Sequence, residues 1–248
     1  MFLKVPLKRF YYSSINLLFP LRCLVCGKDI NQYQSIPLCE EHLAMINLTK
    51  KPFCEKCGRK LSSEMQSEYI CITCRDTKWH FDRQFSATVY NEVMQELVHL
   101  YKYGMRNYLA SSLASFMIKF MDDYIDAKTI DFVIPVPLHW RRYLYRGFNQ
   151  AYEIARRFSH QYSSKISTGN LRRIRYTTPQ VGLSNEERKK NIRGAFTVIN
   201  PERLTGKNIL LIDDVFTTGA TMNECARILK ESGVLSVTGF TLSQPLVF

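Results

Sequence analysis

Residues whose types could do chemistry gather in one stretch, Leu210–Thr221, which reads LLIDDVFTTGAT. The apolar run Ile209–Ile212 is short enough for a buried strand, and two carboxylates, Asp213 and Asp214, follow where that strand should end. A loop of small residues then leads into a helix predicted over residues 221–232. Small residues let backbone N–H groups approach a phosphate closely, and the helix N-terminus adds partial positive charge. Because two carboxylates repel a phosphate, the ligand must also carry hydroxyls, and a ribose phosphate meets that demand.

The segment IDDVFTTGAT resembles the signature of type I phosphoribosyltransferases, which bind 5-phosphoribosyl-1-pyrophosphate (PRPP). The resemblance implies that the catalytic pair Asp213 and Asp214 contacts the ribose hydroxyls. It also implies Mg²⁺, bound with PRPP and bridging substrate oxygens rather than sitting in a protein cage. The 5′-phosphate would be cradled by Thr217, Thr218, Gly219, Ala220 and Thr221. The competing interpretation is a tight turn and an N-cap before an ordinary helix.

A second anion-binding unit is predicted upstream, where the strand-like run Asp131–Pro137 leads into a basic, turn-rich loop over residues 138–150. A helix is predicted from residue 151. Arginine forks suit bidentate contact with phosphate, and a glycine allows close backbone approach. In phosphoribosyltransferases the loop at this place binds pyrophosphate, which implies that role for Arg141, Arg142, Arg146 and Gly147. We interpret His139 as structural rather than catalytic.

Seven of the eight cysteines lie between residues 23 and 74, in pairs separated by two residues. Two residues between ligands let a tight turn aim both side chains at one ion, so the pairs indicate zinc. His42 occupies a slot that a cysteine would fill. Eight ligands are enough for two saturated, and therefore structural, sites. The sequential grouping is Cys23, Cys26, Cys39 and His42, then Cys54, Cys57, Cys71 and Cys74; an interleaved grouping and disulfides are the alternatives.

The whole chain from Leu18 to Leu242 resembles the ComF family, through the zinc pairs, PVPLHWRRYLYRGFNQA and RxTxPQxxLxxxxRxxNxxGAF. That family joins a zinc module to a phosphoribosyltransferase-like domain and is linked to natural transformation. The resemblance implies a mobile hood loop over residues 172–196 that closes over PRPP, with Arg175, Gln180 and Arg188 as its candidate residues. An exposed basic loop is the alternative. DNA-uptake proteins are the implied protein partners.

Positive charge is concentrated in one part of the 248-residue chain, whose formal net charge is +12. Thirteen Lys and Arg and three acidic residues lie between Arg141 and Arg193. This clustering favours polyanionic partners, and interleaved aromatic residues suggest single-stranded DNA. The alternative is that these arginines serve only PRPP and its pyrophosphate.

The chain carries no apolar run of membrane-spanning length, and its apolar content of 46% argues against global disorder. We expect a cytoplasmic protein, with peripheral membrane contact as the alternative for the basic N-terminus. Three parts are predicted: an amphipathic lead-in (1–22), a double zinc ribbon (23–79) and a phosphoribosyltransferase-like domain (80–248). The domain is expected to be α/β, with a mainly parallel sheet. Further elements are predicted as strands over 85–90 and 236–242 and helices over 93–100 and 108–125; Lys102, after the first of these helices, would either reach a phosphate or be solvated.

Three functions fit these observations. One is an active phosphoribosyltransferase of nucleotide metabolism or salvage, which transfers the ribose phosphate to an acceptor. Another is a PRPP-binding relative that acts in DNA uptake and transformation. The third is a nucleic-acid-binding module built on the zinc ribbons. No residue in the sequence identifies an acceptor, so the sequence leaves the catalytic activity open.

Overall fold

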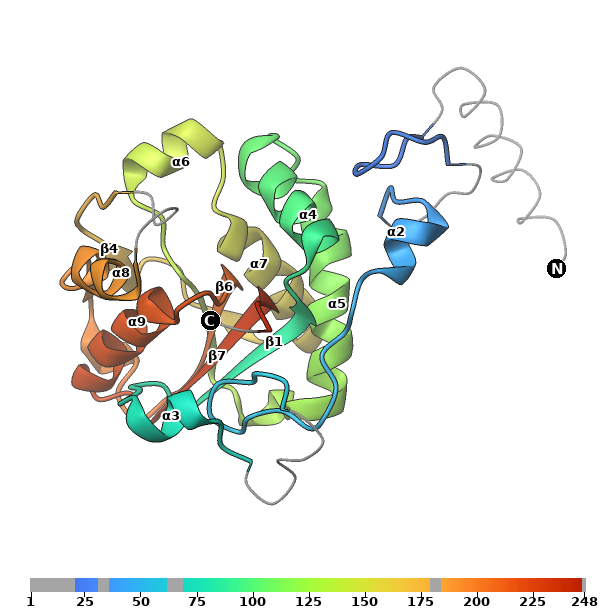
Figure 1. Cartoon of the computed structure of the whole chain (residues 1–248). Coiled ribbons are helices and arrows are strands. Elements are labelled where there is room, and N and C mark those ends of the chain that lie inside the picture. The colour runs from blue at the N-terminus through green and yellow to red at the C-terminus, as the bar shows by residue number, and fades with distance from the viewer. Residues whose placement is uncertain (1–20, 31–35, 62–68, 179–183, 247–248) are drawn as a thin grey trace, which may run out of the picture.

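The computed structural model describes residues 21–30, 36–61, 69–178 and 184–246, and its centre is a parallel sheet (Figure 1). Within these residues, five strands lie in the order β1-β7-β6-β2-β3, and every neighbouring pair runs parallel. Parallel strands bring their carboxyl ends to one edge of a sheet, where ligands of open α/β folds bind. The strands are β1 (Arg83–Val89), β2 (Phe132–Pro135), β3 (Lys165–Ile166), β6 (Asn208–Val215) and β7 (Ser236–Gln244).

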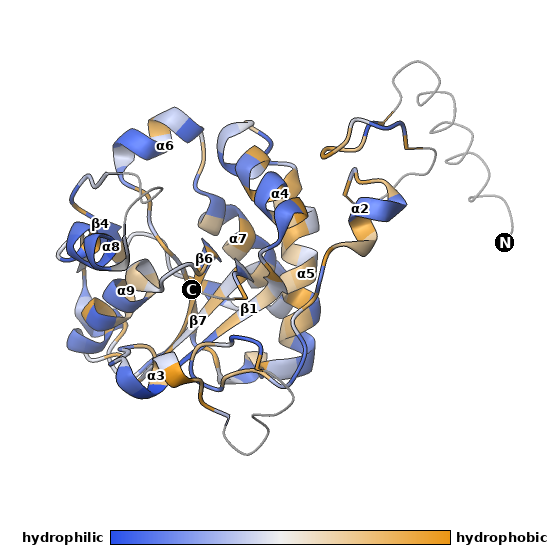
Figure 2. Ribbon diagram, viewed as in Figure 1, coloured by the Kyte–Doolittle hydropathy of each residue, from blue (hydrophilic) through white to orange (hydrophobic). Residues whose placement is uncertain are grey.

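Helices cover both faces of this sheet, and the central strand β6 shows why. Consecutive residues of a strand face opposite sides. Leu210 and Ile212 join one core with residues of three helices, whereas Ile209 and Leu211 join a second core with residues of α9 (Ala220–Glu231). Hydrophobic residues therefore colour the strands and the inner sides of these helices in Figure 2. The three helices on the first face are α4 (Glu92–Tyr103), α5 (Leu109–Tyr124) and α7 (Gln150–Tyr162).

The cysteine-rich part is arranged in two pieces, which contact the sheet differently. The first, with α2 (Glu40–Ala44), lies beyond α4 and away from the sheet (Figure 1). The linker after it pairs with the outer edge of β1 through an antiparallel bridge between Leu48 and Thr88. The second piece, which ends in α3 (Ile72–Asp76), lies directly against β1.

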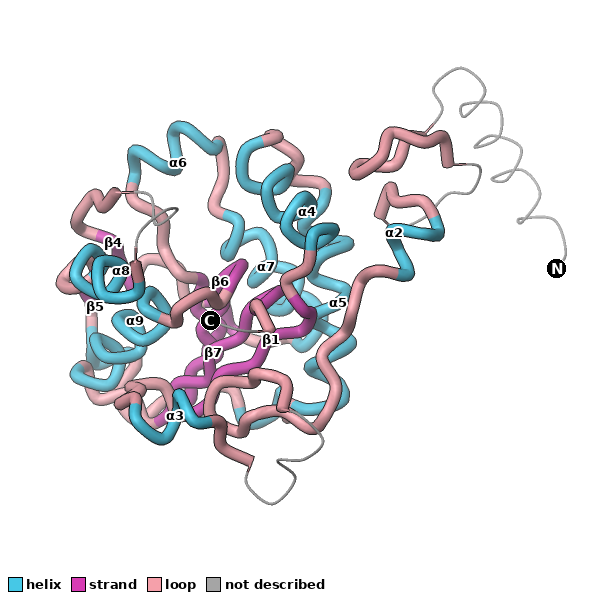
Figure 3. Tube along the Cα trace, viewed as in Figure 1, coloured by secondary structure: helices cyan, strands magenta, loops and turns pink. Residues whose placement is uncertain are grey.

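The segment after β3 forms a small unit of its own beside α9 (Figure 3). β4 (Leu171–Arg173) and β5 (Phe196–Val198) are antiparallel, and α8 (Asn185–Ile192) lies between them in sequence. Ser184 caps α8, and the Glu187 side chain accepts a hydrogen bond from the Ser184 N–H at 2.8 Å. This capping box explains a helix in a stretch too polar to show an apolar face.

The α/β prediction is confirmed, with differences at several boundaries. The predicted loop over 138–150 contains the helix α6 (Trp140–Arg146), and the predicted loop over 172–196 contains β4, α8 and the start of β5. β6 continues to Val215, so both carboxylates lie inside the strand rather than after it. α4 continues to Tyr103, past the predicted break. The described part of the chain also contains two 3-10 turns, Ala127–Thr129 and Pro201–Arg203, and none of its helices is both long and apolar enough to cross a membrane.

Candidate functional site

A cavity of about 480 Å³ opens at the carboxyl end of β6, where the sequence predicts the site. Its walls come from β6 and the loop after it, from the start of α9, from the end of α4, from α6 and from the unit that contains β4 and α8. It therefore joins segments from the whole phosphoribosyltransferase-like part of the chain. The residues used below that line it are Tyr90, Lys102, Tyr103, Arg141, Arg142, Arg146, Arg173, Tyr176, Arg188, Asp213, Asp214, Thr217, Gly219, Ala220, Thr221 and Thr241.

The two carboxylates occupy opposite faces of β6 at its carboxyl end. Asp214 belongs to the face of Leu210 and Ile212, toward α4, and its Oδ2 lies 3.0 Å from the Nζ of Lys102. Asp213 belongs to the α9 face, and its Oδ1 accepts a hydrogen bond from the Asp214 N–H at 2.9 Å. The end of the strand thus carries one carboxylate on each of its two faces.

The electrostatic setting of Asp213 differs from that of an exposed carboxyl. Burial, together with the neighbouring charge of Asp214, raises the pKa of Asp213 from 3.8 to about 7. The cations of Lys102 and Arg173 act against this rise and favour the ionised form. A carboxyl held close to its titration range in a cavity is typical of a functional site.

The predicted phosphate loop lies at the N-terminus of α9. Gly219 is the N-cap of this helix, at φ +75°, and has no side chain with which to cap the first turn. A Cβ at this position would lie 2.6 Å from a ring atom of Phe216 and 2.8 Å from one of Trp79, so both backbone conformation and packing require glycine. Thr217, Gly219, Ala220 and Thr221 line the cavity, whereas the Thr218 hydroxyl accepts a hydrogen bond from the Ala220 N–H at 3.4 Å.

The predicted pyrophosphate residues lie on α6, across the cavity from α9. The His139 Nδ1 accepts from the Arg141 N–H at 3.3 Å and begins the helix, and Gly147 ends it at φ +77°. Burial and the charge of Arg141 lower the pKa of His139, which keeps this nitrogen neutral and able to accept. His139 is therefore structural, as predicted. Arg142 donates to the Thr177 carbonyl at 2.9 Å, which joins α6 to the segment after β4.

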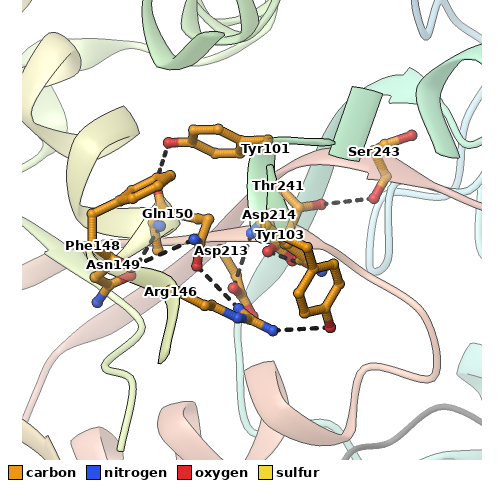
Figure 4. Close-up of polar contacts among 12 residues, drawn as sticks. Tyr101, Tyr103, Arg146, Phe148, Asn149, Gln150, Asp213, Asp214, Thr241 and Ser243 are labelled. Atoms are coloured by element: carbon orange, nitrogen blue, oxygen red, sulfur yellow. Dashed lines mark hydrogen bonds and ion pairs between the residues drawn. The ribbon is translucent and has the colours of Figure 1, made fainter. Parts of the chain in front are cut away.

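Arg146 connects α6 to two other elements (Figure 4). Its guanidinium donates to the Gln150 Oε1 at 3.0 Å and to the Tyr103 hydroxyl at 3.3 Å, and it lies over the Tyr103 ring. Tyr103 ends α4, directly after the lysine that pairs with Asp214. The last turn of α4 therefore contacts both the acidic side and the basic side of the cavity.

A fourth arginine, which the sequence pattern did not assign to the site, completes the basic wall. Arg173 of β4 is largely buried, and its Nε has no hydrogen-bond partner. Burial and the nearby charge of Arg142 lower the pKa of Arg173 to about 10. In the described part of the chain, no ion pair with an acidic side chain is found for Arg141, Arg142, Arg146 or Arg173. A cluster of cations without acidic partners favours an anionic ligand.

The three candidate residues of the predicted hood have different positions. Arg188 of α8 lines the cavity. Arg175 instead donates to the carbonyls of Asn191 and Arg193 at 2.9 and 2.7 Å, so it fixes the end of α8. Gln180 lies outside the described residues. Sequence spacing could not distinguish Arg172, which is exposed, from Arg173, which faces the cavity, because that choice depends on the short strand β4.

The eight predicted zinc ligands form two groups in space, and the grouping is sequential. Within each group the candidate ligand atoms all lie within 4.8 Å of one another. Three thiols and an imidazole make the first group, and four thiols make the second, which are donor sets typical of tetrahedral zinc. In the first, the His42 Nδ1 lies 3.0 Å from the Cys39 Sγ. Four protein ligands leave no open position, so both sites are structural.

Comparisons with known proteins agree with this division of the chain. Residues 14–75 match the model of the double zinc ribbon domain, and residues 116–243 match the model of the phosphoribosyl transferase domain. The second match includes α6, the four arginines, the acidic pair and the phosphate loop.

Relatives match the chain over nearly its full length. It is 26% identical to competence protein F of Haemophilus influenzae over 230 residues, which are 91% of this chain and 98% of that protein. It is 25% identical to competence protein ComFC of Streptococcus pneumoniae over 231 residues, 90% of this chain and 99% of that protein. It is 28% identical to the DNA utilization protein YhgH of Escherichia coli K12 over 204 residues, 80% and 86% of the two chains.

Proposed function

We propose, for a chain that belongs to the phosphoribosyl transferase domain family and resembles the ComF family, that the cavity binds PRPP together with Mg²⁺ and that this binding serves DNA uptake. The observation that carries the proposal is the composition of the cavity. Two carboxylates at the end of β6 lie between a helix N-terminus whose N-cap is a glycine and four arginines without acidic partners among the described residues. A ligand with a diol between a phosphate and a pyrophosphate matches that order of groups.

Each part of PRPP has a corresponding set of residues. Asp213 and Asp214 accept hydrogen bonds from the ribose hydroxyls, and Thr217–Thr221 with the start of α9 bind the 5′-phosphate. Arg141, Arg142 and Arg146 bind the pyrophosphate, and Arg173 and Arg188 add positive charge beside it. Mg²⁺, when bound with PRPP, neutralises part of the pyrophosphate charge. α8, which lies in the predicted hood segment, would help to exclude water from the sugar.

Titration calorimetry with PRPP in the presence and absence of Mg²⁺ tests this proposal. We expect binding that requires Mg²⁺. Replacing both Asp213 and Asp214 with Ala should weaken the binding free energy by roughly 1.5–3 kcal/mol for each charged hydrogen bond that is removed. Asp131, which lies at the opposite end of the sheet and accepts from the Asn208 N–H, provides the control through Asp131→Asn. Unchanged PRPP affinity in the double variant would refute the ribose assignment.

The proposed role in DNA uptake rests on the names of the relatives and on the positive charge of the chain. Single-stranded DNA and DNA-uptake proteins are the proposed partners, in the cytoplasm, where reducing conditions keep zinc-binding thiolates intact. Fluorescence anisotropy with single-stranded DNA at physiological salt tests the DNA part. No association at micromolar protein would leave a PRPP site with structural zinc.

A second candidate function, transfer of the ribose phosphate to an acceptor, is favoured by the aromatic side of the cavity. Tyr90, Tyr103 and Tyr176 line it, and aromatic rings suit a planar acceptor such as a base. Measuring pyrophosphate release from Mg²⁺–PRPP with a panel of bases and amines distinguishes transfer from binding alone. Release with one acceptor would establish the transferase reaction; PRPP binding without release would favour a regulatory role.

A further inference from the structure

The last turn of α4 places the cation of Lys102 against the acidic pair, on the face of the sheet opposite α9. The Nζ of Lys102 lies 3.0 Å from the Asp214 Oδ2, and the two side chains are only 21% and 12% exposed. Ion pairs on the surface contribute little, but a pair this shielded from water interacts strongly. Lys102 belongs neither to the phosphate loop nor to the basic wall of α6.

The position of Lys102 is held by the residues on either side of it. The hydroxyl of Tyr101, which is fully buried, donates to the Gln150 carbonyl at 2.9 Å and fixes α4 against α7. The hydroxyl of Tyr103 accepts from Arg146 at 3.3 Å. Gly104 then ends the helix, and its N–H donates to the Leu100 carbonyl at 2.8 Å. Lys102 is therefore presented to the acidic pair by an anchored turn rather than by a loose loop.

Several elements contribute cations to the cavity that contains the acidic pair. They are Lys102 on α4, Arg141, Arg142 and Arg146 on α6, Arg173 on β4 and Arg188 on α8; the titratable neutral groups are Tyr90, Tyr101, Tyr103 and Cys225. Within the described residues, Lys102 is the cation that makes direct contact with the pair. It lowers the otherwise raised pKa of Asp213 without contacting that residue.

We propose that Lys102 is a positioning residue of the ribose site: it holds the Asp214 carboxylate in place, and its positive charge favours the ionised form of the acidic pair, which accepts from the ribose hydroxyls. This inference rests on the proposed PRPP function. Lys102 acts through the carboxylates and is not itself assigned a contact with the ligand. Without Lys102, less positive charge compensates the two adjacent carboxylates at the end of β6, which disfavours their ionised form.

The test compares four proteins: the wild type, Lys102→Met, Lys102→Arg and, as a matched control, Lys119→Met on α5. Lys119 is exposed and does not line the cavity. The first measurement is an NMR titration of the Asp213 side-chain carboxyl in the ligand-free proteins. We expect Lys102→Met to move its midpoint to higher pH, and Lys102→Arg and Lys119→Met to leave it near the wild-type value.

The second measurement is the affinity for Mg²⁺–PRPP between pH 6 and 8.5. We expect Lys102→Met to weaken binding about tenfold at pH 7, with a smaller loss at pH 8.5, and Lys102→Arg to restore most of it. If the Met variant does not fold, Lys102→Gln provides the same test, because it removes the positive charge but keeps a hydrogen-bond donor. Wild-type midpoint and affinity in Lys102→Met would overturn the proposal, and so would a loss that is equal at every pH. Failure of the wild type to bind PRPP would instead refute the proposed function, because the carboxyl titration does not depend on PRPP.

Discussion

At the scale of single residues, the site is built from two neighbours in sequence that have different surroundings. The Oδ2 of Asp214 lies 3.0 Å from the Nζ of Lys102. Asp213 lies on the other face of β6, near the buried thiol of Cys225 and the positive charge of Arg173. A strand that ends in two carboxylates can therefore accept hydrogen bonds on both sides. The arrangement lowers stability at neutral pH, since ionising Asp213 requires charge in a poorly solvated position.

Replacing Asp213 with Asn should make the protein more stable at neutral pH. The pKa of Asp213 in the folded protein, about 7, lies above its ordinary value of 3.8. The contribution of the neutral carboxyl to the free energy of unfolding is therefore fully present below pH 4 and is lost as the pH rises through 7. We expect Asp213→Asn to gain on the order of 2 kcal/mol relative to the wild type between pH 4 and pH 8, measured by urea unfolding.

Asp131→Asn provides a control of opposite sign. The hydrogen bond from the Asn208 N–H lowers the pKa of Asp131, so its contribution is present above its unfolded pKa and is lost in acid. This variant should be less stable than the wild type at pH 7 and should approach it at low pH. The same slope for both variants would show that the surroundings of Asp213 do not disfavour its charge.

The cluster of arginines predicts that pyrophosphate alone stabilises the fold. A dianionic or more highly charged ligand relieves the repulsion among Arg142, Arg146 and Arg173, and a ligand at 100 times its dissociation constant adds about 2.7 kcal/mol. Thermal unfolding with inorganic pyrophosphate should show a rise in Tm that shrinks in Arg173→Met. The control is Arg156→Met, which removes an exposed arginine of α7 paired with Glu153. An equal rise in both variants would exclude Arg173 from the anion site.

At the scale of elements, the ends of two helices, α6 and α9, line the cavity. α6 has seven residues, begins at a histidine cap and ends at a left-handed glycine, so its arginines project from a fixed turn. α9 begins at Gly219 beneath the rings of Trp79 and Phe216, and its open N-terminus faces α6 across the cavity. The proposed anion-binding groups are therefore carried by helix ends, whose geometry is set by their caps.

Gly219→Ala should disturb the phosphate loop more than an alanine at another left-handed glycine. At Gly206, with φ +71°, an added Cβ meets nothing within 4 Å, so only the backbone strain of about 1 kcal/mol applies. At Gly219 the Cβ must also displace Trp79 or Phe216. We expect Gly219→Ala to lose more stability and most of its PRPP affinity, and Gly206→Ala to keep normal affinity, by calorimetry. Equal affinities would show that the loop adjusts freely.

At the scale of the whole molecule, the two zinc groups have different relations to the sheet. Cys54, Cys57 and Cys71 are buried in the same core as Ile209, Leu211 and the α9 residues, and a Cβ on Gly58 would lie 2.6 Å from the Gln84 carbonyl of β1. The first group lies beyond α4, and Cys26 is exposed there. Cys23 of the first group is buried as well, in the other core, which contains residues of α4 and α5. Both zinc groups are thus joined to the packing of the phosphoribosyltransferase domain, and the second is joined through more of its ligands.

Losing the second zinc should therefore destabilise the domain more than losing the first. Metal analysis of the wild type is expected to give two zinc ions per chain, and Cys57→Ser and Cys26→Ser one each. A structural zinc contributes about 10–16 kcal/mol to the folding free energy of its own module. Because the second module shares a core with the domain, unfolding of the module should also destabilise the domain. We expect Cys57→Ser, which removes a buried ligand, to lower the Tm by roughly 5 °C or more, and Cys26→Ser, which removes an exposed one, to lower it less. Equal shifts would contradict a closer connection of the second zinc group to the core.

The basic surface predicts a salt-dependent interaction with single-stranded DNA that is separable from PRPP. Arg172 and Lys190 are exposed on the outside of the unit that contains β4 and α8, whereas Arg173 faces the cavity. Replacing Arg172 and Lys190 with Glu should flatten the slope of log K against log salt by about 0.7 for each DNA phosphate that the variant no longer neutralises. PRPP affinity should remain normal. Unchanged DNA binding in this variant would place the DNA elsewhere on the chain.

The sequence alone determined those features that depend on short spacing. The run LLIDDVFTTGAT predicted a strand, an acidic pair and a helix N-terminus in the right order, and the cysteine pairs predicted two groups of ligands. Local spacing is sufficient there because a turn or a strand end brings together residues that are already neighbours in the chain. The resemblance to the ComF family added the division into a zinc ribbon and a phosphoribosyltransferase domain.

Only the tertiary structure decided which distant side chains meet. Lys102 pairs with Asp214 because α4 packs on one face of β6, and Arg173 reaches the cavity because two residues of a short antiparallel strand must face opposite sides. α6 and α8 were hidden from periodicity, since helices this short and polar depend on their caps and on neighbouring elements more than on an apolar face. Contacts between residues far apart in the chain leave no fixed spacing in the sequence, because the fold alone sets the distance between them.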